Sequence, residues 1–241
     1  MAPFRQCLSY VLKTDRIVFL GLSLITETER SVYGGIVRLC MDINDVAQRR
    51  PAVAARERIV STAYALFTRR GVRAVGIDEI ISQSQVAKAT MYRHFRTKND
   101  LVLAVLQRRE QLWTFDLVEQ QSRLRGNTAE EQLLAIFDVF HDWFQKREDF
   151  DGCSFINVLI EMGTTHPAGQ ASIQYLDNIR SIVRQRAETA GLHDPDSFAR
   201  SWHILMKGSI ISAAEGDLEA AHRAQDMART LIEQHRRPAA S

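Results

Sequence analysis

The hydrophobic positions of this chain recur at helical spacing from residue 54 onward. The first predicted helix carries four apolar residues on one face: Ile59, Ala63, Leu66 and Phe67. Gly71 follows at a position typical of a helix end. Shorter apolar faces come next, over residues 77–81 and 87–95, separated by a turn at residues 84–86. The pattern therefore predicts three short helices in succession, the last two joined tightly.

A longer helical region is predicted to follow this trio. Thr97 and Asp100 have the spacing of a capping box, which marks the start of a helix. Gly, Pro and Asn then separate further segments of helical periodicity. The predicted helices span residues 99–124, 128–147, 153–164, 168–190, 195–214 and 217–236. We therefore expect an all-α protein, with a small domain over residues 54–100 and a larger helical domain over residues 101–241.

Residues 1–53 have a different character. They lack sustained helical periodicity, so we expect a poorly ordered amino-terminal extension. An alternative hypothesis is that translation starts at Met41. The apolar run over residues 17–25 is too short to span a bilayer, and no small-residue cleavage site follows it. We expect no membrane association.

Composition fits this picture and adds a division of charge. The chain has 241 residues with 45% hydrophobic residues, 12 Gly and 5 Pro, which suits a mostly helical globular protein. Its three cysteines are far apart, so neither a disulfide framework nor a zinc site follows, and a cytoplasmic location is simplest. Residues 54–104 hold nine Lys/Arg against four Asp/Glu, whereas residues 105–241 hold fifteen against twenty. The basic block predicts a polyanionic partner for that part of the chain.

The residue types of the third short helix indicate that this polyanion is DNA. Two short helices joined by a tight turn are typical of a helix-turn-helix, whose second helix enters the major groove of DNA. Met91 and Phe95 can face inward, while five polar or amphipathic residues remain outside: Lys88, Thr90, Tyr92, Arg93 and His94. Arg and Thr can contact base edges, and Tyr, His and Lys commonly contact phosphates. Taken singly, Lys88 could instead be a solvated surface residue and Tyr92 a half-buried core edge.

This region resembles the amino-terminal domain of TetR-type repressors. The resemblance rests on an ordered string of residues: Gly71-x5-Ile77-x2-Ile80, followed by Val86-Ala87-Lys88-Ala89-Thr90-Met91-Tyr92-Arg93-His94-Phe95-x2-Lys98-x2-Leu101. It implies an all-helical homodimer with a variable ligand-binding core, released from a palindromic operator when an effector binds. It also implies that Thr90 and Arg93 read bases, and that Tyr92, His94 and Lys98 contact phosphates.

Two positions depart from the family pattern. Gln85 stands in the turn where Gly is usual, so it must take a left-handed conformation or reshape the turn. Ala87 stands where a Ser cap is frequent, and it offers no capping side chain. We expect these departures to alter local geometry rather than the fold.

The larger domain lacks the sequence signatures of common enzymes and cofactor sites. No His lies in ligand-like spacing with a Cys, so we predict no metal and no cofactor. Polar residues among large apolar ones instead favour a ligand pocket between helices. The candidate lining residues are Trp113, Phe144, Cys153, Phe155, Asn157, Glu161, Trp202 and Met206. Asn157 or Glu161 would orient the ligand; the alternative is that these residues simply fill the core.

Cys153 allows a further hypothesis. The Gly-Cys-x-Phe-Ile-Asn run that begins at Gly152 also resembles a segment found in many TetR-type proteins. At the start of a predicted helix, a thiol could have a lowered pKa and sense electrophiles, although Asp149 and Asp151 oppose this. Buried cysteines are more often inert packing residues.

The resemblance also implies that the last two helices, over residues 195–214 and 217–236, form a four-helix dimer interface. Their apolar stripes could alternatively be core. We therefore predict a ligand-responsive DNA-binding regulator, most simply a repressor, whose effector class is unknown. Two rivals are an architectural DNA-binding protein without a sensor role and a helical enzyme with a DNA-binding head.

Overall fold

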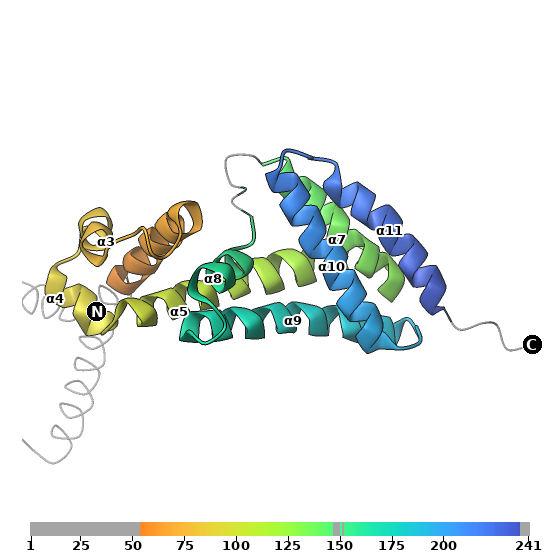
Figure 1. The fold of residues 1–241 in the computed structure, drawn as a ribbon, viewed down its shortest axis with the longest axis horizontal. Helices are drawn as coiled ribbons and strands as arrows, with labels where there is room; N and C mark the ends of the chain where they lie inside the picture. The colour runs from red at the N-terminus through yellow and green to blue at the C-terminus, as the bar shows by residue number, and fades with distance from the viewer. Residues whose placement is uncertain (1–53, 147–149, 151, 237–241) are drawn as a thin grey trace, which may run out of the picture. The chain divides into compact units, whose positions relative to one another are not determined.

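The computed structural model describes residues 54–146, 150 and 152–236. Within this part of the chain all regular secondary structure is helical, and no strand occurs there (Figure 1). The all-α prediction is confirmed. The predicted extension over residues 1–53 and the start at Met41 lie outside the described residues.

Three short helices form the head of the molecule: one over residues 54–70, α3 (Ile77–Ser84) and α4 (Lys88–His94). Their apolar faces meet in a small core, as the periodicity predicts. Its fully or almost fully buried members are Ile59, Ala63, Phe67, Ile80, Met91 and Phe95. Gly71 ends the first helix with φ +80°, and its N–H bonds to the carbonyl of Phe67. This is the helix end expected from the sequence.

A long helical segment leads from the head into the body. It consists of α5 (Lys98–Arg109), η1 (Glu110–Gln121) and α6 (Ser122–Arg125), which follow one another without a break. Thr97 and Asp100 form the predicted capping box, with each side chain bonded to the other's backbone N–H. The single helix predicted over residues 99–124 is therefore present, but its middle part is π-helical, a form often found at functional sites.

Five helices complete the body: α7 (Ala129–Phe144), α8 (Ser154–Met162), α9 (Pro167–Thr189), α10 (Pro195–Ala214) and α11 (Ala220–His235). Helix α9 packs against α5, α7, α8 and α10, and α11 packs on α7 and α10 (Figure 1). The bounds of α10 match the prediction. Helix α11 begins later than the predicted residue 217, because the Asp217 carboxylate accepts from the Glu219 N–H and binds the Arg223 side chain.

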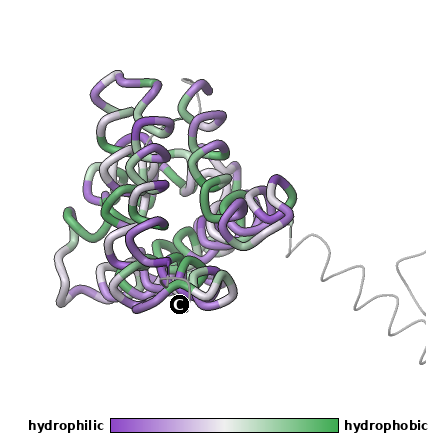
Figure 2. Tube along the Cα trace, turned by 90° about the vertical axis from the view of Figure 1, so that its right-hand side faces the viewer, coloured by the Kyte–Doolittle hydropathy of each residue, from purple (hydrophilic) through white to green (hydrophobic). Residues whose placement is uncertain are grey.

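Aromatic side chains fill the centre of the body. Phe137 and Phe198 each pack on Trp202, with ring centroids 5.3 and 5.2 Å away. Trp113 packs on Phe140, at 5.6 Å. Figure 2 shows hydrophilic and hydrophobic residues alternating along the helices, as amphipathic helices do around a core. None of the helices in the described part of the chain has both the length and the apolar character needed to cross a bilayer.

Candidate nucleic-acid interface

The turn between α3 and α4 is held by a strained residue. Gln85 ends α3 in the left-handed region, with φ 52° and ψ 46°. Its N–H bonds to the carbonyl of Ser82, and the N–H of Val86 bonds to that of Ile81. The turn thus keeps its geometry without Gly, at a cost of about 1 kcal/mol. Ala87 precedes α4 and provides no side-chain cap, as expected.

Helix α4 has one inward and one outward face. Met91 is fully buried and Phe95, just after the helix, is almost so. Lys88, Tyr92 and Arg93 are exposed, Tyr92 with 45% of its surface accessible. An exposed Tyr beside exposed cations is the surface expected of a helix that contacts a polyanion.

Lys88 and Thr90 differ in their freedom to contact DNA. The Nζ atom of Lys88 lies 3.3 Å from a carboxylate oxygen of Asp78, and both side chains are well exposed. Such an ion pair is weak in water, so a phosphate can replace Asp78. Thr90 is half-buried near the amino end of α4. Its role as a base reader stays a prediction.

His94 is less available than its neighbours on α4. Its Nε2 atom is buried and has no hydrogen-bond partner among the described residues. Burial lowers the pKa of His94, and Arg93 and Arg56 lower it further. A neutral imidazole with one buried nitrogen can contact a phosphate only through Nδ1, and this predicted contact remains untested.

Lys98 is the first residue of α5 and is half-buried. Its Nζ atom lies 5.9 Å from the centre of the Phe67 ring. Burial lowers the pKa of Lys98, whereas the nearby Glu161 raises it. The amino end of a helix favours an anion, although the capping box already bonds the Asp100 N–H to the Thr97 hydroxyl here. Lys98 is therefore placed as expected for a phosphate contact, which stays a prediction.

Comparison with known proteins agrees with this geometry. A family described as "Bacterial regulatory proteins, tetR family" matches residues 59–105, the head and the start of α5. The transcriptional regulator AcuR of Cereibacter sphaeroides is 26% identical over 171 residues, which cover 67% of this chain and 77% of AcuR. The crystal structure of SCO4454, a TetR-family transcriptional regulator from Streptomyces coelicolor, is 26% identical, has a TM-score of 0.69, and is matched over 76% of this chain and 96% of that one.

The chain carries the DNA-binding domain of the TetR family of bacterial transcriptional regulators. A further TetR-family structure, the putative regulator sav143 from Streptomyces avermitilis, is 27% identical with a TM-score of 0.67 over 75% of this chain and 97% of that one. The activator FasR of Mycolicibacterium smegmatis is 40% identical over 65 residues, which cover 27% of this chain and only 30% of FasR. Proteins of this family regulate transcription by binding DNA and are not enzymes.

The body of this regulator does not gather the eight predicted pocket residues around one cavity. Phe144, Phe155, Trp202 and Met206 are almost completely buried in the core. The other four line three separate cavities: Asn157 and Glu161 a small one of about 50 Å³, Cys153 and Asn157 one of about 280 Å³, and Trp113 one of about 430 Å³. Because the aromatic residues pack on one another, the core-filling alternative describes those four better.

Cys153 lies just before the first turn of α8 but is almost completely buried. Burial raises the pKa of its thiol, and this outweighs the lowering by backbone hydrogen bonds and Arg109. A lowered pKa, on which the electrophile-sensor hypothesis depended, is therefore not found. Asp149 and Asp151 lie outside the described residues.

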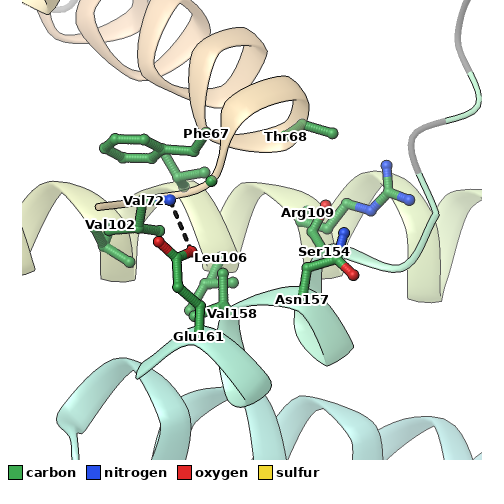
Figure 3. A pocket seen from close by; sticks show the side chains of 12 residues that line it. Phe67, Thr68, Val72, Val102, Leu106, Arg109, Ser154, Asn157, Val158 and Glu161 are labelled. Atoms are coloured by element: carbon green, nitrogen blue, oxygen red, sulfur yellow. Dashed lines mark hydrogen bonds between the residues drawn. The ribbon is translucent and has the colours of Figure 1, made fainter. Parts of the chain in front are cut away.

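Glu161 connects the body to the head. Its Oε2 atom accepts a hydrogen bond from the N–H of Val72 at 2.8 Å (Figure 3). Its Oε1 atom accepts one from the N–H of Arg73 at 2.6 Å. Gly71 has φ +80°, a conformation that favours glycine, and a Cβ atom there would lie 3.1 Å from Oε2, so the carboxylate would have to shift slightly to accept a larger residue. The carboxylate of α8 thus holds the loop that connects the first helix of the head to α3.

Two features of the body were missed by sequence reasoning. Helix packing brings together His141, Glu219 and His222, whose ligand atoms lie within 4.8 Å of one another and could hold a divalent metal. Glu219 and His222 have the local spacing i, i+3, but His141 comes from α7, far away in the sequence, so local spacing could not have completed the group. Arg109 is buried at the end of α5, where it continues the apolar stripe of Val102, Val105 and Leu106. An arginine on an apolar stripe was the available signal.

Proposed function

We propose that this regulator binds a palindromic operator as a homodimer, most simply as a repressor, and that a small-molecule effector in the body releases it. The single observation that carries the proposal is the outward face of α4. Exposed Lys88, Tyr92 and Arg93 stand on a helix that Met91 anchors to the head, and the head is joined to the body by one continuous helical segment.

The surface of α10 supports dimerisation through the last two helices. Ile204 and Ile211 are exposed on one face of α10, 70% and 47% accessible, although most apolar residues of this helix are buried. Gly208 lies between them, and nothing lies within 4 Å of the place where its Cβ would be. Met227 of α11 is also exposed. Apolar side chains around a glycine allow close approach of a second copy, which would cover them.

Dimerisation also has a geometric purpose. Two recognition helices must lie about 34 Å apart to enter successive major grooves of one DNA face. In the proposed mechanism, one state of the dimer has this spacing and the other does not. An effector releases DNA only if it binds the second state more tightly. The continuous segment from α5 to α6 and the Glu161 contact are the two connections through which the body moves the head.

The experiment that tests this proposal is selection of DNA sequences by the purified protein at fixed, physiological salt. Salt must be fixed because phosphate contacts make affinity strongly salt-dependent. An enriched palindrome supports a dimeric, sequence-specific regulator. Uniform binding without an enriched sequence contradicts it and favours an architectural role.

One variant and its control then test the outward face of α4. Arg93→Ala is expected to reduce affinity for the selected operator by about tenfold or more, with a smaller loss on random DNA, because bidentate base contacts contribute ~1–3 kcal/mol of discrimination. The matched control is Arg123→Ala, an exposed arginine on α6. Equal loss on both DNAs would make Arg93 a phosphate contact.

The dimer surface is tested by light scattering after gel filtration. Ile204→Glu is expected to shift the protein toward the monomer, because it places a charge in the apolar interface. Leu124→Glu, at an equally exposed apolar residue of α6, serves as the control. A dimer that survives Ile204→Glu while Leu124→Glu dissociates would place the interface elsewhere.

A further inference from the structure

A cavity of about 430 Å³ lies where the first helix of the head meets the body. Tyr64 and Arg69 line it from the helix over residues 54–70, and Arg109 and Trp113 from the long helical segment. Trp143 and Lys146 line it from α7 and the residues that follow. The volume is within the range of small-molecule sites.

Arg109 is a buried cation that forms no ion pair with an acidic residue in the part of the chain that the structure describes. Only 9% of its surface is accessible, and its Nε atom is buried with no acceptor in the described part of the chain. One terminal nitrogen donates to the Tyr64 hydroxyl at 2.6 Å. The guanidinium carbon lies 5.6 Å from the ring centre of Trp113 and 5.6 Å from that of Trp143. The phenol and the two ring faces stabilise the charge only in part, since a buried cation is expensive without a counter-ion.

The other lining residues add positive charge. Arg69 and Lys146 are exposed at this cavity, and no described residue that lines it is acidic. The adjacent Arg108 is different, because it forms an ion pair with Glu57. Three cations therefore converge on one cavity, and Arg109 among them is desolvated.

We propose that this cavity binds a small organic anion whose carboxylate pairs with Arg109 and Arg69 and whose apolar part packs on Trp113 and Trp143. A guanidinium fork recognises a carboxylate through two parallel hydrogen bonds. Tyr64 accepts from Arg109, so its own O–H is free to donate to the second carboxylate oxygen. The indole N–H of Trp113 also has no acceptor among the described residues.

The position of the cavity gives such an anion a regulatory role, and this part rests on the proposed function. Tyr64 and Arg69 belong to the head, whereas Arg109 and Trp143 belong to the body. A carboxylate that pairs with arginines on both sides fixes their separation. Arg109 also lies at the junction of α5 and η1, where the helix changes its hydrogen-bonding register. The anion is thus placed to favour one of the two head orientations of the proposed mechanism, either the one with operator spacing or the one without it.

The test compares charged probes with neutral ones of the same shape. Butyrate, benzoate and octanoate are each titrated calorimetrically against their primary amides, with the full-length protein. At least one carboxylate is expected to bind about tenfold or more tightly than its amide, because charge-assisted hydrogen bonds contribute more than neutral ones. The proposal is overturned if no carboxylate binds more tightly than its amide.

Variants locate the binding. Arg109→Met is expected to abolish the carboxylate preference, and Arg69→Gln to reduce it about threefold or more. Arg123→Gln, an arginine outside the cavity, should leave the preference unchanged. Arg69 is exposed, so its variant keeps the test decisive even if Arg109→Met does not fold. A preference that persists in a folded Arg109→Met protein, or that is undiminished in Arg69→Gln, would overturn the assignment.

A DNA readout separates this inference from the proposed function. Affinity for the selected operator is measured with and without the carboxylate that binds best. Loss of affinity supports the anion as effector class. Tight carboxylate binding without any change in DNA affinity confirms the anion site and overturns its effector role. Palindrome binding without any carboxylate preference leaves the dimeric regulator intact and overturns the anion site.

Discussion

Two buried arginines mark the two ends of η1, and they differ in what surrounds them. Arg186 of α9 lies at the carboxyl end, where it donates to the Ser122 hydroxyl at 2.7 Å and to the carbonyls of Gln132 and Glu119 at 3.0 Å each. Burial lowers the pKa of Arg186 to about 10, so the guanidinium stays charged at neutral pH. Arg109, at the amino end, donates one hydrogen bond to the Tyr64 hydroxyl. Its guanidinium otherwise lies over the rings of Trp113 and Trp143.

The difference in hydrogen bonding separates two roles for a buried cation, which are to stabilise the fold and to bind a ligand. The hydrogen bonds of Arg186 join α9 to the end of η1 and to α7, so its charge stabilises the fold. Arg109 keeps unused donor capacity beside a cavity, so its charge is suited to a ligand. The same residue type, at similar burial, therefore stabilises the fold at Arg186 and, under our proposal, binds a ligand at Arg109.

The largest expected effect is at Arg186. Arg186→Met should lower the free energy of unfolding by about 3–5 kcal/mol, because it removes three hydrogen bonds that a buried, charged donor makes to the Ser122 hydroxyl and to the carbonyls of Gln132 and Glu119. Chemical denaturation measures the loss. Arg184→Met, at a half-exposed position on the same helix where the arginine pairs with Asp196, should change stability by about 0.5 kcal/mol or less. A similar small change at Arg186 would remove the contrast between the two arginines.

A second prediction concerns His203, a buried polar residue that avoids a buried charge because its pKa is lowered. Its Nδ1 atom has no partner among the described residues, and burial, Lys207 and Arg180 lower its pKa to about 3. The unfolded chain takes up a proton near pH 6.5 and the folded protein does not, so stability falls as pH drops from 6.5 toward 3. At pH 5 this loss is ~2 kcal/mol relative to pH 7. His203→Leu should flatten the dependence of unfolding free energy on pH, measured by chemical denaturation between pH 7 and pH 5. An unchanged slope would mean that other titratable groups cause the dependence.

A third, smaller effect is expected at the link between body and head. Glu161→Gln should lower stability by about 1–2 kcal/mol, because an amide has one acceptor oxygen where the carboxylate has two bonded to N–H groups. It should also weaken the effect of any body ligand on DNA affinity. Thermal denaturation and operator binding measure the two consequences. Glu215→Gln, an exposed carboxylate after α10, is the control. Unchanged ligand response would assign coupling to the long helical segment alone.

The smallest change in stability is expected at Arg109 itself. Arg109→Met should leave the ligand-free protein within about 1 kcal/mol of wild type or make it more stable, because the desolvation cost of the cation roughly offsets the lost Tyr64 hydrogen bond. Thermal denaturation without ligand measures this. A loss as large as that of Arg186→Met would show that Arg109 is structural, and the comparison would fail.

Much of the head could be predicted from sequence because its information is local. The Thr97–Asp100 capping box, the Gly71 helix end and the burial of Met91 and Phe95 follow from spacings of a few residues. The left-handed conformation of Gln85 was one of two alternatives that the family pattern left open, the other being a reshaped turn.

The body could be predicted only in outline. Helix α10 has its predicted bounds, but the π-helical register of η1 leaves no mark in a pattern of apolar residues. The predicted pocket residues were selected for being aromatic or polar near aromatic ones, and such residues satisfy one another in a core. The cavity beside Arg109 depends on helices far apart in the sequence, as does the Glu161 contact, and no local pattern contains that information.

The contact between Glu161 and the loop after Gly71 has a practical consequence. The N–H groups of Val72 and Arg73 are the donors of its two hydrogen bonds. Their hydrogen–deuterium exchange rates depend on how often the head separates from the carboxylate. Two adjacent amide protons thus form a built-in reporter of head mobility, readable without an attached probe and before any operator is known.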